Sequence, residues 1–197
     1  LLPATIGAVA IAEPLYTVFY GKPDSLALGL FILAMLQTVI LGLYTVLSPM
    51  IQALFQNRKA ILYFGYGVLV KLILQVPFIY LFKAYGPLLS TTIGLMIPIV
   101  LMYKEIHQVT HFNRKTVFKR SLLTAILTLI MLLVVLIAGF ILGLVIKPNG
   151  RVTSMIYVAL IGGVGIVVYG GLGLRLRFLD RFIGSKAASL RNKFHIS

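Results

Sequence analysis

The stretch that decides the fold is residues 61–82, which read ILYFGYGVLVKLILQVPFIYLF. As a helix, an apolar run of about 20 residues matches the hydrocarbon layer of a bilayer, which is about 30 Å thick. Near its centre stands one cation, Lys71. A lysine at that depth costs about 2.5–3.5 kcal/mol on insertion scales, so it normally faces a protein interior or a watery cavity. Lys71 is therefore a candidate functional residue; the alternative is a lysine that reaches the interface or pairs with a neighbour for structural reasons alone.

Outside this stretch the composition is that of an integral membrane protein. Of the 197 residues 60 % are hydrophobic, whereas soluble domains have about 45–50 %. The net charge of +14 would suggest nucleic acid in a soluble protein. Here the cations stand in short runs between apolar segments, so orientation in the membrane explains them better, and we predict no nucleic-acid partner.

The sequence predicts neither a metal site nor a cofactor. It contains no Cys, which excludes a disulfide framework and a thiolate metal site. His107 and His111 have the spacing i, i+4, but no third ligand is near them, and catalytic zinc sites use three protein ligands. The sequence has no HExxH, GxSxG or Walker glycine motif and no paired carboxylates, so we do not expect an enzyme.

Six apolar segments separated by short polar turns predict an all-α integral membrane protein with six transmembrane helices. The segments are residues 1–20, 25–55, 61–82, 88–103, 121–146 and 152–174. Pro14 follows Glu13 in the first segment and should kink it within the membrane. Small residues in the fourth segment, such as Ser90 and Gly94, and a glycine-rich sixth segment predict close helix packing.

We divide the chain into four parts on this basis. They are four helices in residues 1–103, a basic cytoplasmic loop at 104–120, two additional helices in 121–174, and a basic cytoplasmic tail at 175–197. The tail mixes Arg and Lys with apolar residues, so we expect it to lie on anionic membrane lipid. The sequence starts at Leu1, inside an apolar segment, which we interpret as the start of a fragment.

The cations predict the orientation of the segments. Four Lys and Arg stand in the turns at 21–24, 83–87 and 147–151, and thirteen stand in the turns and tail of the other side. Together with Lys71 these are all 18 cations of the chain. The positive-inside rule then puts the second side, including the C-terminus, in the cytoplasm. We therefore expect a multi-pass protein of the cell membrane.

A second intramembrane charge, Glu13, is the only carboxylate within an apolar segment. It lies about seven residues, or roughly 10 Å, below the outer boundary, and Lys71 lies roughly 15 Å deep. Because the two heights are similar, we predict a polar cavity for an anionic or sugar-bearing substrate; the alternative is a structural ion pair. Gln75 stands at i+4 from Lys71 and shares its face. Arg58 stands at the predicted cytoplasmic mouth, where it could meet a phosphate, although the orientation rule also explains it.

Several loose motifs carry a resemblance to a known family. They are residues 2–7 (LPATIG), 12–15 (AEPL), 19–21 (FYG), 49–59 (PMIQALFQNRK), 70–72 (VKL) through 85–87 (YGP), and 90–94 (STTIG). With these motifs the chain resembles the C-terminal part of a flippase in the multidrug/oligosaccharidyl-lipid/polysaccharide (MOP) exporter superfamily. The branch it resembles contains the polysaccharide biosynthesis proteins of Gram-positive bacteria, which are related to MurJ-type lipid II flippases and the stage V sporulation protein B group.

The resemblance implies two six-helix lobes around a central cavity, with two further helices in some members. This chain would supply the last six of fourteen helices, and its partner would be the missing N-terminal lobe of the same chain. The implied function is flipping of a lipid-linked saccharide, either lipid II or a polysaccharide or oligosaccharide precursor, by alternating access. One alternative is a cation-coupled small-molecule (multidrug) exporter of the same superfamily. Another is a non-transporting membrane scaffold of cell-wall synthesis.

Overall fold

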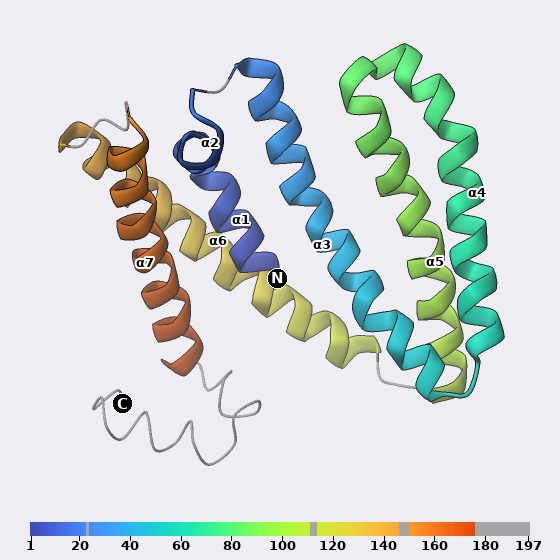
Figure 1. The fold of residues 1–197 in the computed structure, drawn as a ribbon. Helices are drawn as coiled ribbons and strands as arrows, with labels where there is room; N and C mark the ends of the chain where they lie inside the picture. Colours follow the sequence, from blue (N-terminus) through green and yellow to red (C-terminus); the bar gives the residue numbers. More distant parts are fainter. Residues whose placement is uncertain (23, 111–113, 146–149, 176–197) are drawn as a thin grey trace. The chain divides into compact units, whose positions relative to one another are not determined.

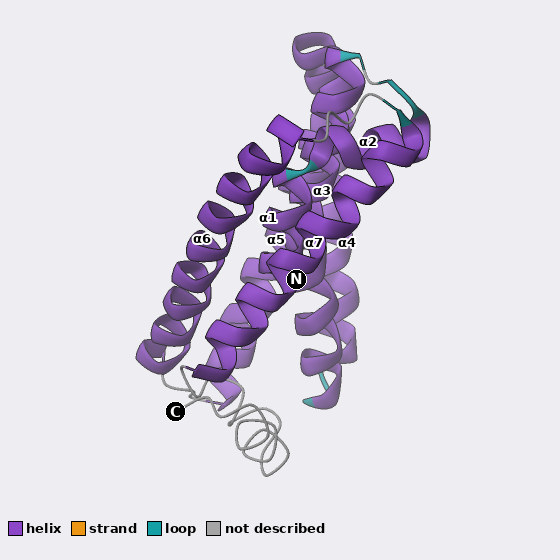
Figure 2. Cartoon of the chain, turned by 90° about the vertical axis from the view of Figure 1, so that its left-hand side faces the viewer, coloured by secondary structure: helices purple, strands orange, loops and turns teal. Residues whose placement is uncertain are grey.

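In the computed structural model, residues 1–22, 24–110, 114–145 and 150–175 are described, and their regular structure is entirely helical (Figures 1 and 2). The elements are α1 (Leu2–Ala10), α2 (Ala12–Tyr20), α3 (Ser25–Ala53), α4 (Asn57–Phe82), the 3-10 turn η1 (Lys83–Tyr85), α5 (Gly86–Thr110), α6 (Arg114–Val145) and α7 (Arg151–Arg175). The prediction of an all-α protein is confirmed.

Most of these helices are long and apolar enough to cross a membrane. Four helical stretches of the described chain qualify by length and composition: Ser25–Ala53, Asn57–Thr110, Val117–Leu144 and Arg151–Gly171, with the bent pair α1 and α2 as a fifth. The stretch Asn57–Thr110 contains two helices, α4 and α5. Large apolar side chains stay exposed on them; Ile73, for example, is 70 % exposed. The chain is therefore a multi-pass membrane protein whose helices present apolar surface to lipid.

The helices form two compact units. The first contains Leu1 and residues 24–117, which include α3, α4 and α5, and the second contains residues 2–23 and 118–197, which include α1, α2, α6 and α7. The predicted division of the chain at residues 103 and 121 stays a prediction.

In the first unit, α4 and α5 pack as an antiparallel hairpin through one row of side chains. Every fourth residue of α5 is buried along this row: Gly86, Ser90, Gly94, Pro98, Met102 and Ile106. An i, i+4 row is the ridge that helices commonly use for packing. The residues nearest the turn are small, so the backbones approach closely; a Cβ on Gly86 would lie 2.5 Å from the carbonyl oxygen of Phe78. The predicted close packing at Ser90 and Gly94 is confirmed.

At the opposite end of the hairpin, larger side chains join α3 to α4 and α5. Ile51, Ala60, Met102 and Ile106 form a buried cluster there. Asp24 caps the other end of α3, where its side chain accepts a hydrogen bond from the backbone N–H of Ala27 at 2.6 Å. The first unit is thus packed around α5, with its large apolar core at the end remote from the η1 turn.

In the second unit, a sharp break at Ile11 separates α1 from α2, whose axes differ by 79°. Pro14 is the third residue of α2. In a continuous helix its ring would clash with the carbonyl of Ala10, four residues earlier, so the helix ends at Ala10 and restarts. The predicted kink is confirmed. In Figure 1, α2 is seen nearly end-on, while α1 and α7 are seen from the side.

The buried apolar cluster of the second unit includes Ile11. Its side chain is buried with Met131 and Val135 of α6 and Ile161 of α7. The hydroxyl of Tyr157 donates a hydrogen bond to the carbonyl of Gly139 at 2.9 Å, which links α7 to α6. The break between α1 and α2 is therefore part of the core of this unit.

Two expectations for the later segments need correction. Helix α5 continues to Thr110 and α6 begins at Arg114, so the predicted loop over 104–120 is mostly helical. The polar residues mark where the apolar stretch ends, but a helix satisfies its own backbone groups and can continue past that boundary. In α7, a Cβ on Gly162, Gly163, Gly170 or Gly171 would meet nothing within 4 Å in the described part of the chain, whereas a Cβ on Gly165 would lie 3.4 Å from Val135. The predicted close packing along the glycines of α7 is therefore not observed. The tail after Arg175 lies outside the described residues.

Candidate functional site

Lys71 lies in the middle of α4 and lines a pocket between α4 and α5 of about 110 Å³. The pocket is lined by Phe64, Gly67, Val68, Lys71, Thr91, Gly94, Leu95 and Pro98. Lys71 is the one charged residue among them. Thr91 is the other residue with a polar side chain, and its hydroxyl already donates to the carbonyl of Pro87 at 2.7 Å. The pocket is therefore a small, mostly apolar recess, and Lys71 is the one charged residue in its lining.

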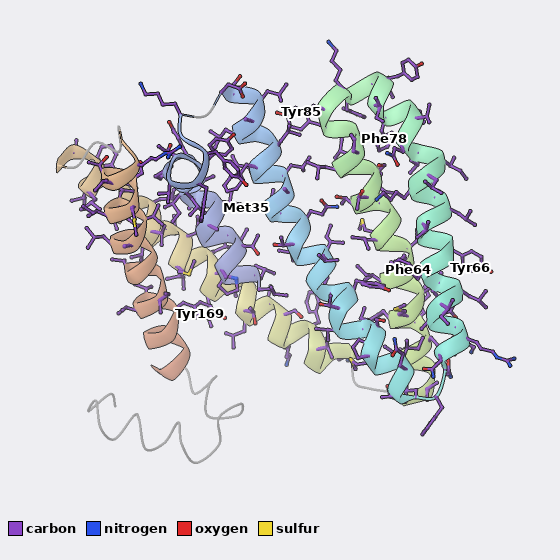
Figure 3. All side chains as sticks on the ribbon, in the orientation of Figure 1. Met35, Phe64, Tyr66, Phe78, Tyr85 and Tyr169 are labelled. Carbon is purple, nitrogen blue, oxygen red and sulfur yellow. The ribbon has the colours of Figure 1, made fainter. Side chains whose placement is uncertain are left out.

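Two glycines bring the helices together directly beside Lys71. A Cβ on Gly94 would lie 2.8 Å from both the carbonyl oxygen of Gly67 and the Cβ of Lys71. A Cβ on Gly67 would lie 2.5 Å from the carbonyl oxygen of Gly94. Both glycines are buried. Figure 3 shows the neighbouring side chains: Phe64 lies on the inner side of α4, and Tyr66 points to its outer side.

Lys71 has no carboxylate partner among the described residues of its own unit. The chain contains four acidic residues. Two of them, Asp24 and Glu105, belong to the described part of this unit, and both are engaged elsewhere. Asp24 caps α3, and Glu105 is paired with Lys59 at 2.5 Å. The charge of Lys71 is therefore unpaired within α3, α4 and α5.

Glu105 is the centre of a polar cluster that sequence analysis missed. Its carboxylate accepts hydrogen bonds from Lys59 Nζ at 2.5 Å and from the hydroxyl of Tyr63 at 3.0 Å, and its side chain is only 13 % exposed. Glu105 and Lys59 lie outside the apolar segments 61–82 and 88–103. The hydrogen bond from Lys59 lowers the pKa of the Glu105 carboxyl, and the same bond raises the pKa of Lys59. The cluster joins the start of α4 to the end of α5.

Glu13 is exposed in the first turn of α2 and belongs to the second unit. Its backbone carbonyl accepts a hydrogen bond from the hydroxyl of Thr17 at 2.9 Å. The 79° bend changes its expected depth. If α1 runs across the membrane, seven residues of α2 add about 2 Å of height and not roughly 10 Å. The similar heights inferred from a straight helix are not supported, and a pairing of Glu13 with Lys71 stays a prediction.

The other two predicted site residues lie on α4 but outside the pocket lining. Gln75 is half-buried, one turn after Lys71. Arg58 is exposed in the first turn of α4, thirteen residues before Lys71, which is roughly 20 Å along a helix. The described structure thus places Lys71 alone, of the four predicted residues, in the pocket. Among the residues described, no three of His, Cys, Asp or Glu could hold a metal ion together.

Comparison with known proteins gives one informative relative. Over 191 residues, which are 94 % of this chain, the sequence is 32 % identical to the lipid II flippase MurJ of Bacillus subtilis (strain 168). The chain spans about a third (35 %) of the length of that protein. No family model matches the sequence. No solved structure matches it either.

The helices and the mid-helix cation define the class: a multi-pass membrane protein with a charged pocket inside an apolar hairpin. The similarity then identifies the chain as a MurJ-like fragment of the MOP exporter superfamily. The resemblance predicted from the sequence motifs is confirmed.

Proposed function

We propose that the protein containing this chain flips a lipid-linked saccharide outward across the cytoplasmic membrane, and that this chain forms part of the path. The similarity to a protein named as a lipid II flippase, over nearly all of this chain, is the observation that carries the proposal. The substrate would be lipid II or a related polysaccharide or oligosaccharide precursor. The protein would be a transporter and not an enzyme, with its C-terminus in the cytoplasm as the distribution of cations predicts.

Lys71 is the residue of this chain that we assign to the substrate path. An unpaired cation inside an apolar helix costs free energy, and such residues usually mark a path for a substrate or ion. The phosphate that joins a lipid carrier to its sugar would provide the missing negative charge through charge-assisted hydrogen bonds. A recess of about 110 Å³ is too small for a whole saccharide head group. Lys71 would therefore contact one charged group of the substrate, and the sugars would occupy a larger cavity between the lobes.

The other predicted residues take secondary places in this proposal. Gln75 lies one turn from Lys71 and could hydrogen-bond the same substrate. Arg58, exposed in the first turn of α4, would meet the phosphate of the substrate on entry from the cytoplasm. Glu13, on α2, would be a further residue of the substrate path, at a depth set by the break before α2. Alternating access between the two lobes would carry the substrate across.

The substitution Lys71→Met in the complete protein tests the assignment, since methionine keeps an unbranched side chain, one atom shorter, and removes the charge. We expect export of the lipid-linked precursor per molecule of protein to fall about tenfold or more, because a hydrogen bond to a charged group is worth about 1.5–3 kcal/mol. The measurement is the amount of precursor at the outer membrane face of cells that depend on this protein.

Lys104→Met is the matched control, because Lys104 is exposed on α5 of the same unit and outside the pocket. It should leave export near the parental level. Normal export by Lys71→Met would remove Lys71 from the substrate path, and a scaffold without transport activity would tolerate both changes.

A further inference from the structure

We propose that Gly67 and Gly94 are positioning residues for Lys71: their contact sets the position of the Lys71 Cα and Cβ relative to α5, and so where its side chain starts at the pocket. The inference rests on the proposed role of Lys71 in transport and adds two residues that touch no substrate. It follows from the contact between the helix backbones, because Gly67 lies one turn of α4 before Lys71 and Gly94 faces both residues.

The contact is reciprocal and leaves no room for a side chain. A Cβ on Gly67 would lie 2.5 Å from the carbonyl oxygen of Gly94, and a Cβ on Gly94 would lie 2.8 Å from the carbonyl oxygen of Gly67. A Cβ on Gly94 would also lie 2.8 Å from Lys71 Cβ and 3.4 Å from Lys71 Cα. Non-bonded carbon atoms prefer about 3.5–4.0 Å. Neither a backbone atom nor the Cβ of Lys71 can move by rotation of a side chain, so the helices themselves would have to separate.

The hairpin is fixed at both ends independently of this contact. At one end Gly86 packs against the backbone of Phe78 in α4. At the other end Glu105 binds Lys59 and Tyr63, next to the buried side chains of Met102 and Ile106. An added methyl group in the middle should therefore displace the helices where Lys71 lies while the ends stay joined. For this reason we expect an effect on Lys71 and not a general loss of the hairpin.

A double-mutant cycle in the complete protein separates positioning from packing. The variants are Gly94→Ala, Lys71→Met and their combination, and the control is Gly65→Ala. Gly65 lies on the same helix, two residues before Gly67, and a Cβ there would meet none of the described residues within 4 Å. We expect Gly94→Ala to lower export per molecule about tenfold, since an ångström of misplacement can cost that much or more. In the Lys71→Met background the same change should cost nothing further. Equal losses in both backgrounds would overturn the inference.

A second readout does not depend on transport. The chain has no Cys, so Lys71→Cys introduces the one thiol of this chain. The labelling of the parent, which keeps Lys71, gives the background to subtract. We expect Gly94→Ala and Gly67→Ala to change the rate at which a small water-soluble thiol reagent modifies position 71 by about threefold or more, and Gly65→Ala to leave it unchanged. An unchanged rate in both glycine variants would contradict the inference.

The two readouts keep the inference distinct from the proposed function. If Lys71→Met exports normally, the substrate role fails, and the modification rate alone then decides whether the glycines position residue 71. If neither Gly94→Ala nor Gly67→Ala accumulates to the level of Gly65→Ala, the contact serves folding, and the positioning role is refuted.

Discussion

Glu105 and Lys71 are two charges of one hairpin for which we propose different roles. Glu105 has three features of a structural group: a cationic partner, a hydroxyl donor and little exposed surface. Lys71 lacks a carboxylate partner among the described residues of its unit and lines a pocket. A satisfied buried charge holds elements together, whereas an unpaired one is costly unless a ligand completes it. This contrast is the main reason for assigning Lys71 to the substrate path and Glu105 to the scaffold.

The Glu105 cluster gives a prediction on stability. Glu105→Ala leaves the half-buried hydroxyl of Tyr63 without its acceptor and should lower the free energy of unfolding by on the order of 1 kcal/mol. Lys59→Met should have a smaller effect, because the Lys59 side chain is 47 % exposed and exposed ion pairs contribute little. Thermal unfolding midpoints of the purified protein in detergent measure both. A larger loss with Lys59→Met than with Glu105→Ala would contradict the assignment.

The same cluster predicts a pH dependence. The pKa of Glu105 is lowered from 4.5 and that of Lys59 is raised from 10.5. The stabilisation by Glu105 is therefore complete above its unfolded pKa and is lost as the pH falls through its folded value. The stabilisation by Lys59 is complete below its unfolded pKa and is lost as the pH rises through its folded value. The difference in stability between the parent and Glu105→Gln should be full at neutral pH and shrink in acid; a difference that grows in acid would contradict this sign.

Residue patterns predicted Lys71 and missed Glu105 for a physical reason. A lysine within an apolar run is visible in the sequence alone, because its neighbours define its surroundings. Glu105 lies 46 residues from Lys59, at the polar end of a segment, and only the folded hairpin brings the two together. The predicted topology could have suggested the pairing of Lys59 with Glu105, since residues 56–59 and 104–120 were predicted on one side of the membrane.

Among the elements, α2 departs most from what its sequence suggested. Pro14 predicted that the segment is kinked. It did not predict that the break lies three residues earlier, at Ile11, or that the bend is 79°. Proline fixes where a helix cannot continue, while the angle depends on how the second half packs, here against α7 and with Ile11 in the core. The depth estimated for Glu13 depended on a straight helix, so it changed with the bend.

The break gives a prediction on the conformation of this pair of helices. Pro14→Ala restores the backbone donor and removes the clash with Ala10, so α1 and α2 should straighten. Spin labels on the exposed residues Ala4 and Phe19 should then move apart by about 5 Å, the difference between a bent and a straight helix over fifteen residues.

Pro3→Ala is the control, because Pro3 stands in the first turn of α1, where proline is tolerated. It should leave the distance between the labels unchanged. An unchanged distance in Pro14→Ala would show that packing against α7, and not proline, sets the bend.

For the whole molecule, the alternation of turns agrees with the contacts inside each unit. Gly21 lies near Arg151, whose Nη2 would be 3.9 Å from a Cβ at Gly21, and Lys59 binds Glu105. The sequence predicted a common side for the turns at 21–24 and 147–151, and a common side for those at 56–59 and 104–120. The all-α class and the placing of most helices could therefore be predicted from hydropathy. The hairpin contact at Gly67 and Gly94 could not, because many glycines occur in these segments and only the packing distinguishes this pair.

The predicted orientation is testable with single cysteines, since the chain has none. A membrane-impermeant thiol reagent should modify Lys22→Cys and Arg151→Cys in intact cells. It should modify Arg58→Cys and Lys104→Cys only after the membrane is permeabilised. Modification of Arg58→Cys in intact cells, together with protection of Lys22→Cys, would reverse the topology and place the C-terminus outside.

The claim that a charged pocket in α4 and α5 takes part in flipping is tested most directly with the complete protein in lipid vesicles. The measurement is the rate at which a lipid-linked saccharide becomes accessible to a hydrolase added outside, for the parent and for Lys71→Met. We expect the parent to move the lipid. The rate for Lys71→Met should be lower by about tenfold or more. Equal rates for the two proteins, or no movement by the parent, would contradict the account.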